Sequence, residues 1–219
     1  MLKYPCLVLD HDDTVVQSEA TIHYPCFCEY LKINRPGETL TFHEYVSACT
    51  SMPFEELCRS RYHLTDEELA DEYEFWKQYI KDHIPAPFPG MKTLLDRYRE
   101  AGGKICVVSL STEENILRDY QTHFGFCPDM VFSWDLPEHL RKPDPYALRT
   151  ILEHYGYAPS EILVVDDMKH SIAMARAVGC PIAFAGWGRK EFPAICEEME
   201  HLCDMAFYST ETFENFLFD

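Results

Sequence analysis

The stretch "YPCLVLDHDDTVVQSE", residues 4–19, decides how the rest of the chain is interpreted. It contains four consecutive apolar residues, Cys6–Leu9, which have the length and composition of a short buried strand. Asp10, Asp12 and Asp13 follow at once, so three carboxylates lie within four residues. Carboxylates this close disfavour each other's ionised form, and a cation is expected to compensate them. The stretch therefore predicts a functional site at the tip of a buried strand.

Further apolar strand candidates alternate with helical patterns along the chain. The strands are expected at Lys104–Ser109, Met130–Trp134, Ile162–Val165, Ile182–Ala185 and Met205–Tyr208. Apolar residues at helical spacing predict helices at Met91–Ala101, Glu113–Phe124, Tyr146–Tyr155 and His170–Val178, the last ending at Gly179. This alternation predicts an α/β fold, a Rossmann-like doubly wound parallel sheet covered on both faces.

Residues 15–87 interrupt that alternation, because they contain several helical patterns and no convincing strand. Helices are expected at Ile22–Lys32, Thr41–Ala48, Pro53–Tyr62 and Thr65–His83. The segment "IPAPFPGM" then supplies three prolines and a glycine, typical of a stiff linker. We therefore expect a catalytic core formed by residues 1–14 and 88–219, with a small all-helical cap domain, residues 15–87, inserted after the first strand.

The charge of the chain limits its partners. Its 219 residues carry a formal net charge of −18, which argues against nucleic acid and anionic membrane surfaces. A small phosphorylated substrate stays possible, because a metal ion and one or two cations can reverse the local field. The sequence shows no apolar run of membrane-spanning length and no secretory signal pattern, so a cytoplasmic protein is expected. The oligomeric state cannot be predicted.

Ten cysteines occur at irregular spacings, and no C-x-x-C pair is among them. Several lie in apolar strand or helix contexts, for example Cys6, Cys106 and Cys180. We interpret them as reduced core thiols of a reducing compartment. A zinc site is the alternative, but the paired Cys/His spacing that it needs is missing.

Polar residues that could take part in catalysis or ligand binding follow several of the predicted strands. Asp10 and Asp12 follow the first strand, Ser109 to Thr112 the second, and Asp166 and Asp167 the strand at Ile162–Val165. Lys142 precedes the helix that starts at Tyr146. Because the carboxyl ends of parallel strands meet at one edge of the sheet, these groups are expected to converge there. Together they offer enough carboxylates for a divalent ion, a hydroxyl and a lysine.

Four such elements in this order resemble the haloacid dehalogenase superfamily of phosphohydrolases, and the helical insert resembles its phosphoglycolate-phosphatase-like branch. The resemblance covers nearly the whole chain. The matching motifs are Asp10-x-Asp12-x-Thr14, Ser109, Lys142-Pro143 and Val164-Val165-Asp166-Asp167. Two positions depart from the common pattern, because Asp13 stands where many relatives carry glycine and Leu110 where many carry asparagine.

The resemblance implies a role for each matching residue. Asp10 would be the nucleophile that forms an aspartyl-phosphate, and Asp12 would protonate the leaving alkoxide and later deprotonate water. Mg²⁺ would neutralise the transferring phosphoryl group. Its ligands would be the Asp10 carboxylate, the Asp12 carbonyl and the Asp166 carboxylate, with Asp167 bound directly or through water. The remaining implied roles are phosphate binding by Ser109, the Leu110 N–H and Lys142, which would also lower the pKa of Asp10.

Substrate selection is expected to come from the cap. His43, Arg59 and Arg61 are candidate cations for a second anionic group on the substrate. His23 lies just past the first motif and could line the mouth of the site. For His43, Arg59 and Arg61, a solvated helical face is the alternative interpretation.

The predicted function is a Mg²⁺-dependent phosphatase that hydrolyses a small organic phosphate monoester. Asp12 favours phosphate esters, because relatives that cleave carbon–halogen bonds lack an aspartate at that position. A β-phosphoglucomutase-like phosphomutase is the alternative within the superfamily, and a catalytically silent regulatory protein is a further one. A dinucleotide-binding domain is excluded, because the first strand lacks G-x-G-x-x-G and ends in acidic residues.

Overall fold

A computed structural model describes residues 2–218 and separates the chain into two compact units. The sheet unit runs to Val16 and resumes at Pro87, and the helical unit is Gln17–Ala86. Val15 and Val16 belong to the sheet unit because both are fully buried in its core, so the predicted boundary after residue 14 is two residues early.

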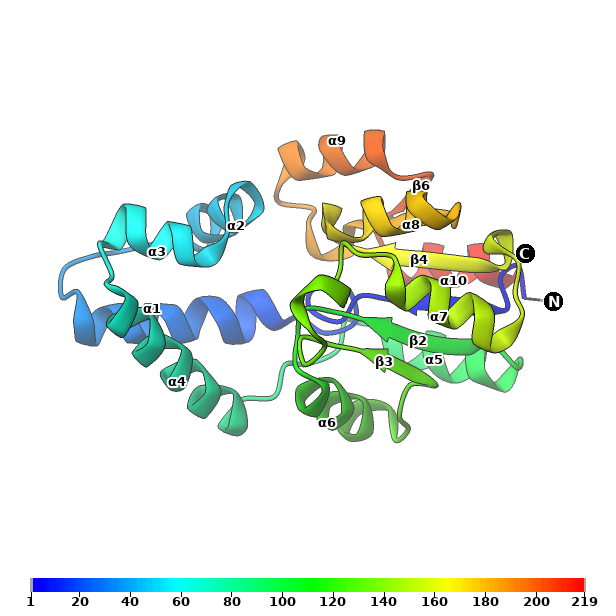
Figure 1. The fold of residues 1–219 in the computed structure, drawn as a ribbon, viewed down its shortest axis with the longest axis horizontal. Helices are drawn as coiled ribbons and strands as arrows, with labels where there is room; N and C mark the ends of the chain where they lie inside the picture. The colour runs from blue at the N-terminus through cyan, green and yellow to red at the C-terminus, as the bar shows by residue number, and fades with distance from the viewer. Residues whose placement is uncertain (1, 219) are drawn as a thin grey trace. The chain divides into compact units, whose positions relative to one another are not determined.

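The sheet unit contains six parallel strands in the order β3-β2-β1-β4-β5-β6 (Figure 1). They are β1 (Cys6–Leu9), β2 (Lys104–Val108), β3 (Met130–Phe132), β4 (Ile162–Asp166), β5 (Ile182–Ala185) and β6 (Met205–Phe207). The chain builds β2 and β3 on one side of β1 and then crosses to β4 on the other. Ligands of such sheets bind beyond the carboxyl ends of the strands at this switch point.

Successive side chains of β1 point to opposite faces of the sheet, and one layer of the core lies on each face. Leu7 and Leu9 point into one apolar cluster, whereas Cys6 and Val8 point into the other. Helices α5 (Met91–Glu100), α6 (Glu113–Phe124) and α10 (Thr210–Phe218) cover the first face, and α7 (Tyr146–Tyr155) and α8 (Ile172–Val178) cover the second (Figure 1). Both faces of β1 are therefore buried, which explains why its sequence is continuously apolar.

The helical unit consists of a π-helical turn and four helices. These are η1 (Glu19–His23), α1 (Tyr24–Asn34), α2 (Phe42–Ser51), α3 (Phe54–Tyr62) and α4 (Asp66–Asp82). Thr41 and Thr65 start α2 and α4 with complete capping boxes, in which each threonine is paired with a glutamate three residues later. Phe27 packs edge-on against Phe54 and Tyr62 at ring-centroid distances of 5.0 and 5.4 Å, which gives the unit its own aromatic core.

The predicted fold class is confirmed, and most element boundaries agree within two residues. The helix at 170–178 begins as a short 3₁₀ turn, η4 (Lys169–Ser171), and ends at Gly179, whose φ of 77° is the left-handed value that favours glycine. The structure adds α9 (Pro193–Leu202) and α10, which the sequence patterns do not predict. Within residues 2–218, no helix is long and apolar enough to cross a bilayer.

Glu72, on α4, is a buried acid inside the helical unit, where it is 7% exposed. Burial raises the pKa of its carboxyl to about 7, Glu55 acts in the same direction, and His23 opposes it. The folded unit therefore favours the protonated form. Above neutral pH Glu72 is ionised, and its buried charge destabilises the folded helical unit.

Replacing Glu72 with glutamine should remove one pH-dependent part of the free energy of unfolding. The native pKa of about 7 lies above the ordinary 4.5, so the wild-type protein should lose about 3 kcal/mol as the pH rises from 4.5 through 7. Urea unfolding at acid and alkaline pH measures this. Glu72→Gln should be the more stable protein at alkaline pH only, and exposed Glu67→Gln on the same helix is the control. Equal pH dependence in all three proteins would contradict the assignment.

Candidate active site

The tight turn that follows β1 presents the acidic residues at the carboxyl edge of the sheet. The Asp10 N–H donates to the Val165 carbonyl on β4 at 2.9 Å, which continues the strand pairing by one residue. The chain then turns back, and the Val15 N–H donates to the His11 carbonyl at 2.9 Å. Asp13 has a φ of 52°, in the left-handed region that favours glycine.

Lys142 binds two of the buried carboxylates. Its Nζ lies 2.5 Å from Asp10 Oδ1 and 3.1 Å from Asp166 Oδ2. The lysine side chain is 3% exposed, and the two carboxylates are 7% and 1% exposed. Lys142 lies between the 3₁₀ turn η2 (Glu138–Leu140) and α7, and the fold brings its ammonium group across to β1 and β4.

For Asp10 and for Lys142, burial shifts the pKa in one direction and the charge of the other residue shifts it in the opposite direction. Burial raises the pKa of the Asp10 carboxyl well above its ordinary value, and Asp166 adds to the increase, whereas Lys142 lowers it. Burial alone would lower the pKa of Lys142, but Asp10 and Asp166 outweigh it and raise that pKa. Lys142 is therefore a charged ammonium group, and its charge favours the ionised form of Asp10.

Asp166 and Asp167 come from the end of β4 and complete the acidic cluster. One oxygen from each of Asp10, Asp166 and Asp167 lies within 4.8 Å of the others, and all three residues are buried. Asp166 is held by the Met168 N–H at 2.8 Å and by the Ser171 hydroxyl. Hard oxygen ligands in this number suit Mg²⁺. The donor set therefore fits a divalent cation.

Arg189 is a site residue that the sequence patterns do not predict. It follows β5 and the 3₁₀ turn η5 (Gly186–Gly188), and it is 1% exposed. Its Nε and Nη2 lie 2.8 and 2.5 Å from Asp167 Oδ2, and its Nη1 lies 3.2 Å from Asp13 Oδ2. The sequence offered one indication, because "GWGR" directly follows a predicted strand, as Asp10 and Asp166 do.

Ser109 and Leu110, the predicted phosphate-binding residues after β2, lie beside the turn that follows β1. Because Leu9 is in register with Val107, Ser109 emerges from the neighbouring strand at the same edge of the sheet. Ser109 is 3% exposed, and its Oγ accepts from the Ser111 N–H at 3.1 Å. Leu110 is 36% exposed, so its side chain is at the surface while its backbone stays next to Ser109.

His11, between Asp10 and Asp12, is directed toward α6. Its Nε2 lies 3.1 Å from Asp119 Oδ2, and its ring stacks on Tyr120. It is 1% exposed, so it belongs to the packing between β1 and α6.

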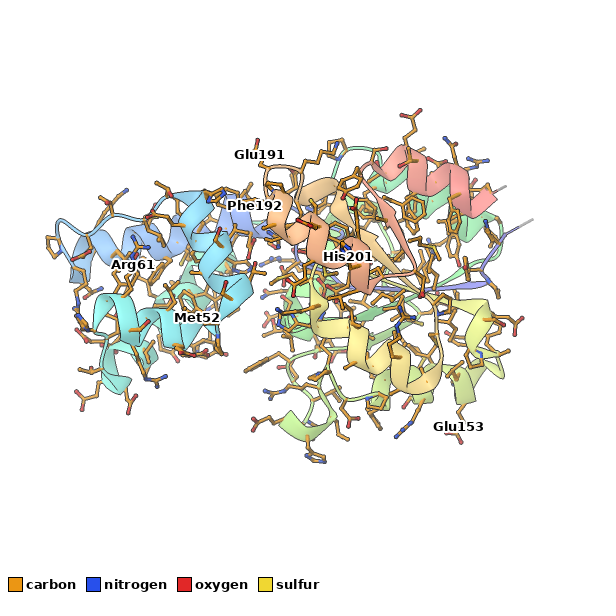
Figure 2. The ribbon with its side chains drawn as sticks, turned by 90° about the horizontal axis from the view of Figure 1, so that it is seen from above. Met52, Arg61, Glu153, Glu191, Phe192 and His201 are labelled. Atoms are coloured by element: carbon orange, nitrogen blue, oxygen red, sulfur yellow. The ribbon has the colours of Figure 1, made fainter. Side chains whose placement is uncertain are left out.

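The four candidate selectivity residues all belong to the helical unit, and three of them have local partners there. Arg59 pairs with Asp66 at 2.8 Å, and Arg61, labelled in Figure 2, pairs with Glu44 at 3.4 Å. The ring of His23 stacks on Trp76, and its Nδ1 accepts from Trp76 Nε1 at 3.1 Å. His43 is exposed near the start of α2.

Comparison with known proteins assigns the chain to a family. The sequence profile of the haloacid dehalogenase-like hydrolases matches residues 7–185, which include the end of every strand that contributes to the acidic site. The chain therefore belongs to this family, and the predicted membership and the hydrolase class are confirmed. A phosphoglycolate phosphatase of Thiobacillus denitrificans is 23% identical over 197 residues, covering 85% of each chain.

Solved structures support the same fold. CbbY from Rhodobacter sphaeroides, solved in complex with phosphate, superposes with a TM-score of 0.67 at 18% identity and covers 95% of both chains. A conserved haloacid dehalogenase-like protein of unknown function from Agrobacterium tumefaciens gives a TM-score of 0.74 at 18% identity, covering 94% of this chain and 93% of that one.

Replacing Lys142 with methionine should destabilise the protein most when metal is absent. The change leaves Asp10 and Asp166 buried without their shared cation, and breaking a buried ion pair typically costs about 3–5 kcal/mol. We expect a loss of that order in urea unfolding with EDTA and a partial recovery with Mg²⁺. Lys92→Met, which removes an exposed pair with Asp96, should lose less than about 1 kcal/mol. Equal losses in the two variants would contradict the proposed charge compensation.

Proposed function

We propose that this protein is a Mg²⁺-dependent phosphatase that hydrolyses a small organic phosphate monoester through an aspartyl-phosphate on Asp10. The observation that carries the proposal is the buried carboxylate of Asp10, bound to Lys142 within a cluster of three acids at the switch point of the sheet. Membership of the hydrolase family and the phosphoglycolate phosphatase named among the relatives support it.

Asp10 has the properties of a nucleophile for phosphorus. Its Oδ1 is bound to Lys142, so the attack is assigned to Oδ2. The Lys142 ammonium group stabilises the ionised carboxylate before attack and remains close to the phosphoryl oxygens afterwards. An aspartate nucleophile divides a very slow hydrolysis into formation and breakdown of an acyl phosphate.

Asp12 is assigned as the general acid and base. In the first step the bond between phosphorus and the ester oxygen breaks, and Asp12 gives its proton to the departing alkoxide. In the second step Asp12 removes a proton from the attacking water, inorganic phosphate leaves, and Asp10 is regenerated. Asp12 is partly exposed, whereas Asp10 is buried, so Asp12 is the more accessible of the two to water.

The acidic cluster supplies the ligands for Mg²⁺. Asp10 and Asp166, with the backbone carbonyl of Asp12, would hold the ion, and Asp167 completes the cluster. When bound, the ion neutralises charge on the phosphoryl oxygens. The Ser109 hydroxyl and the Leu110 N–H would hold the phosphoryl group from the neighbouring strand.

The substrate is proposed to be a small phosphorylated metabolite that the helical unit selects as a cap. Closure of a cap excludes water from a reaction site, which suits small substrates better than phosphoproteins. A phosphorylated carboxylic acid, as in the phosphoglycolate phosphatase relative, is the first class to test. His23, His43, Arg59 and Arg61 remain the candidates for binding its second anionic group. Arg59 and Arg61 would have to exchange their present carboxylate partners for the substrate.

Phosphate release from a panel of small phosphate esters, with Mg²⁺ and with EDTA, tests the proposal. Release should require the metal, and Asp10→Asn should reduce kcat by roughly 10⁴-fold or more while the fold is kept, because only nucleophilicity is lost. The surface variant Asp96→Asn on α5 is the control. A variant Asp10→Asn that keeps most of its rate would refute the mechanism.

The same panel separates hydrolysis from phosphoryl transfer between sugar hydroxyls. A phosphomutase would convert a hexose phosphate into its isomer without releasing phosphate. If no ester releases phosphate but an isomer forms, the protein is a mutase, and if neither occurs, the catalytically silent alternative replaces the proposal.

Replacing Asp12 with asparagine should affect substrates according to their leaving groups. An alkyl phosphate needs a proton on its departing oxygen, so its rate should fall by roughly 10²–10⁴-fold. Formation of the phosphoenzyme from p-nitrophenyl phosphate should fall much less, because p-nitrophenolate leaves without a proton. Rapid-mixing measurement of p-nitrophenolate release isolates this first step. An equal loss for both substrates would show that Asp12 mainly orders the metal site.

A further inference from the structure

Arg189 is a buried cation that the proposed chemistry does not use. Its side chain is 2% exposed, although arginine is rarely buried without partners. A guanidinium group is planar and presents its donors in a fixed fork, so it holds carboxylates in a defined orientation. Arg189 uses this fork to join the end of β4, through Asp167, to the turn after β1, through Asp13.

Other contacts hold the same turn from the same direction. The Thr14 hydroxyl donates to Asp167 Oδ1 at 3.1 Å, and Trp187 Nε1 donates to the Thr14 carbonyl at 3.0 Å. Gly188 packs closely here, because a Cβ at this position would lie 2.8 Å from the Phe88 ring and 3.1 Å from the Asp13 carbonyl. The loop after β5 therefore holds the turn that carries Asp10 and Asp12.

The two cations of the site have different partners. Lys142 is shared by Asp10 and Asp166, and it is a flexible ammonium group that can adjust when another cation arrives. Arg189 is shared by Asp13 and Asp167, and several contacts fix it. Both oxygens of Asp167 already accept from Thr14 and Arg189.

We propose that Arg189 is a positioning residue of the active site: with Asp13, Thr14 and Asp167 it clamps the turn that carries the nucleophile. The inference rests on the proposed function for the role of Asp10 as the nucleophile. The clamp itself is a property of the protein without metal.

Unfolding in EDTA tests the clamp without metal. Arg189→Met should lower Tm, because it leaves Asp13 and Asp167 buried without their cation. The double variant Arg189→Met/Asp167→Asn should recover part of that loss, because one uncompensated charge is gone. Arg176→Met, which removes a half-exposed pair with Asp204 in the same unit, is the matched control and should change Tm little. A double variant no more stable than Arg189→Met would overturn the coupling.

Kinetics separate positioning from stability alone. At a temperature where all variants are folded, Arg189→Met should lower kcat for p-nitrophenyl phosphate by roughly tenfold or more, with KM changed less, because Asp10 is displaced from its reactive geometry. Arg189→Lys, which keeps the charge but not the fork, should be intermediate, and Arg176→Met should match the wild type. Unchanged kcat in folded Arg189→Met would refute the positioning role. If Arg189→Met fails to fold, kcat and KM are measured for Arg189→Lys and Asp167→Asn instead, with the same expected direction of change.

Discussion

The compensation of buried carboxylates at the tip of β1 is the interaction on which the rest of the structure depends. Asp10, Asp13, Asp166 and Asp167 are all buried, and ionised groups in such positions are costly unless they are paired. Lys142 reaches them from the segment before α7, and Arg189 reaches them from the loop after β5. The parallel sheet brings these distant segments together, and the ion pairs that form there stabilise the buried carboxylates.

The two buried cations of the site, Lys142 and Arg189, contact different carboxylates. Lys142 contacts the proposed nucleophile and Asp166, the groups that would change most during phosphoryl transfer. Arg189 contacts Asp13 and Asp167 and keeps the turn in place. A turn held in this way would keep the proposed nucleophile in place, and small displacements of reacting groups can lower a reaction rate strongly. Under the proposed function, Asp13 and Asp167 would stabilise the turn, and Asp10 and Asp166 would take part in the reaction.

Asp13 illustrates how a departure from the family pattern is accommodated. Its φ of 52° suits glycine, and an aspartate there carries conformational strain on the order of 1 kcal/mol. Its carboxylate pairs with Arg189, so the acidic side chain and the buried arginine support each other. Asp13 is thus part of the charge balance of the site, although it has no role in the proposed phosphoryl transfer.

The sequence by itself determined the sheet, the helical insert, the membership of the family and the convergence of Asp10, Asp166 and Lys142. Continuous apolar strands and the polar residues that follow them are local features, and the parallel sheet places such residues at one edge. Only the tertiary structure decided that Arg189 completes the site, that His11 belongs to the packing on α6, and that Val15 and Val16 belong to the core. These outcomes depend on which side chains meet across separate strands and helices, and the periodicity of a single segment contains no information about its distant partners.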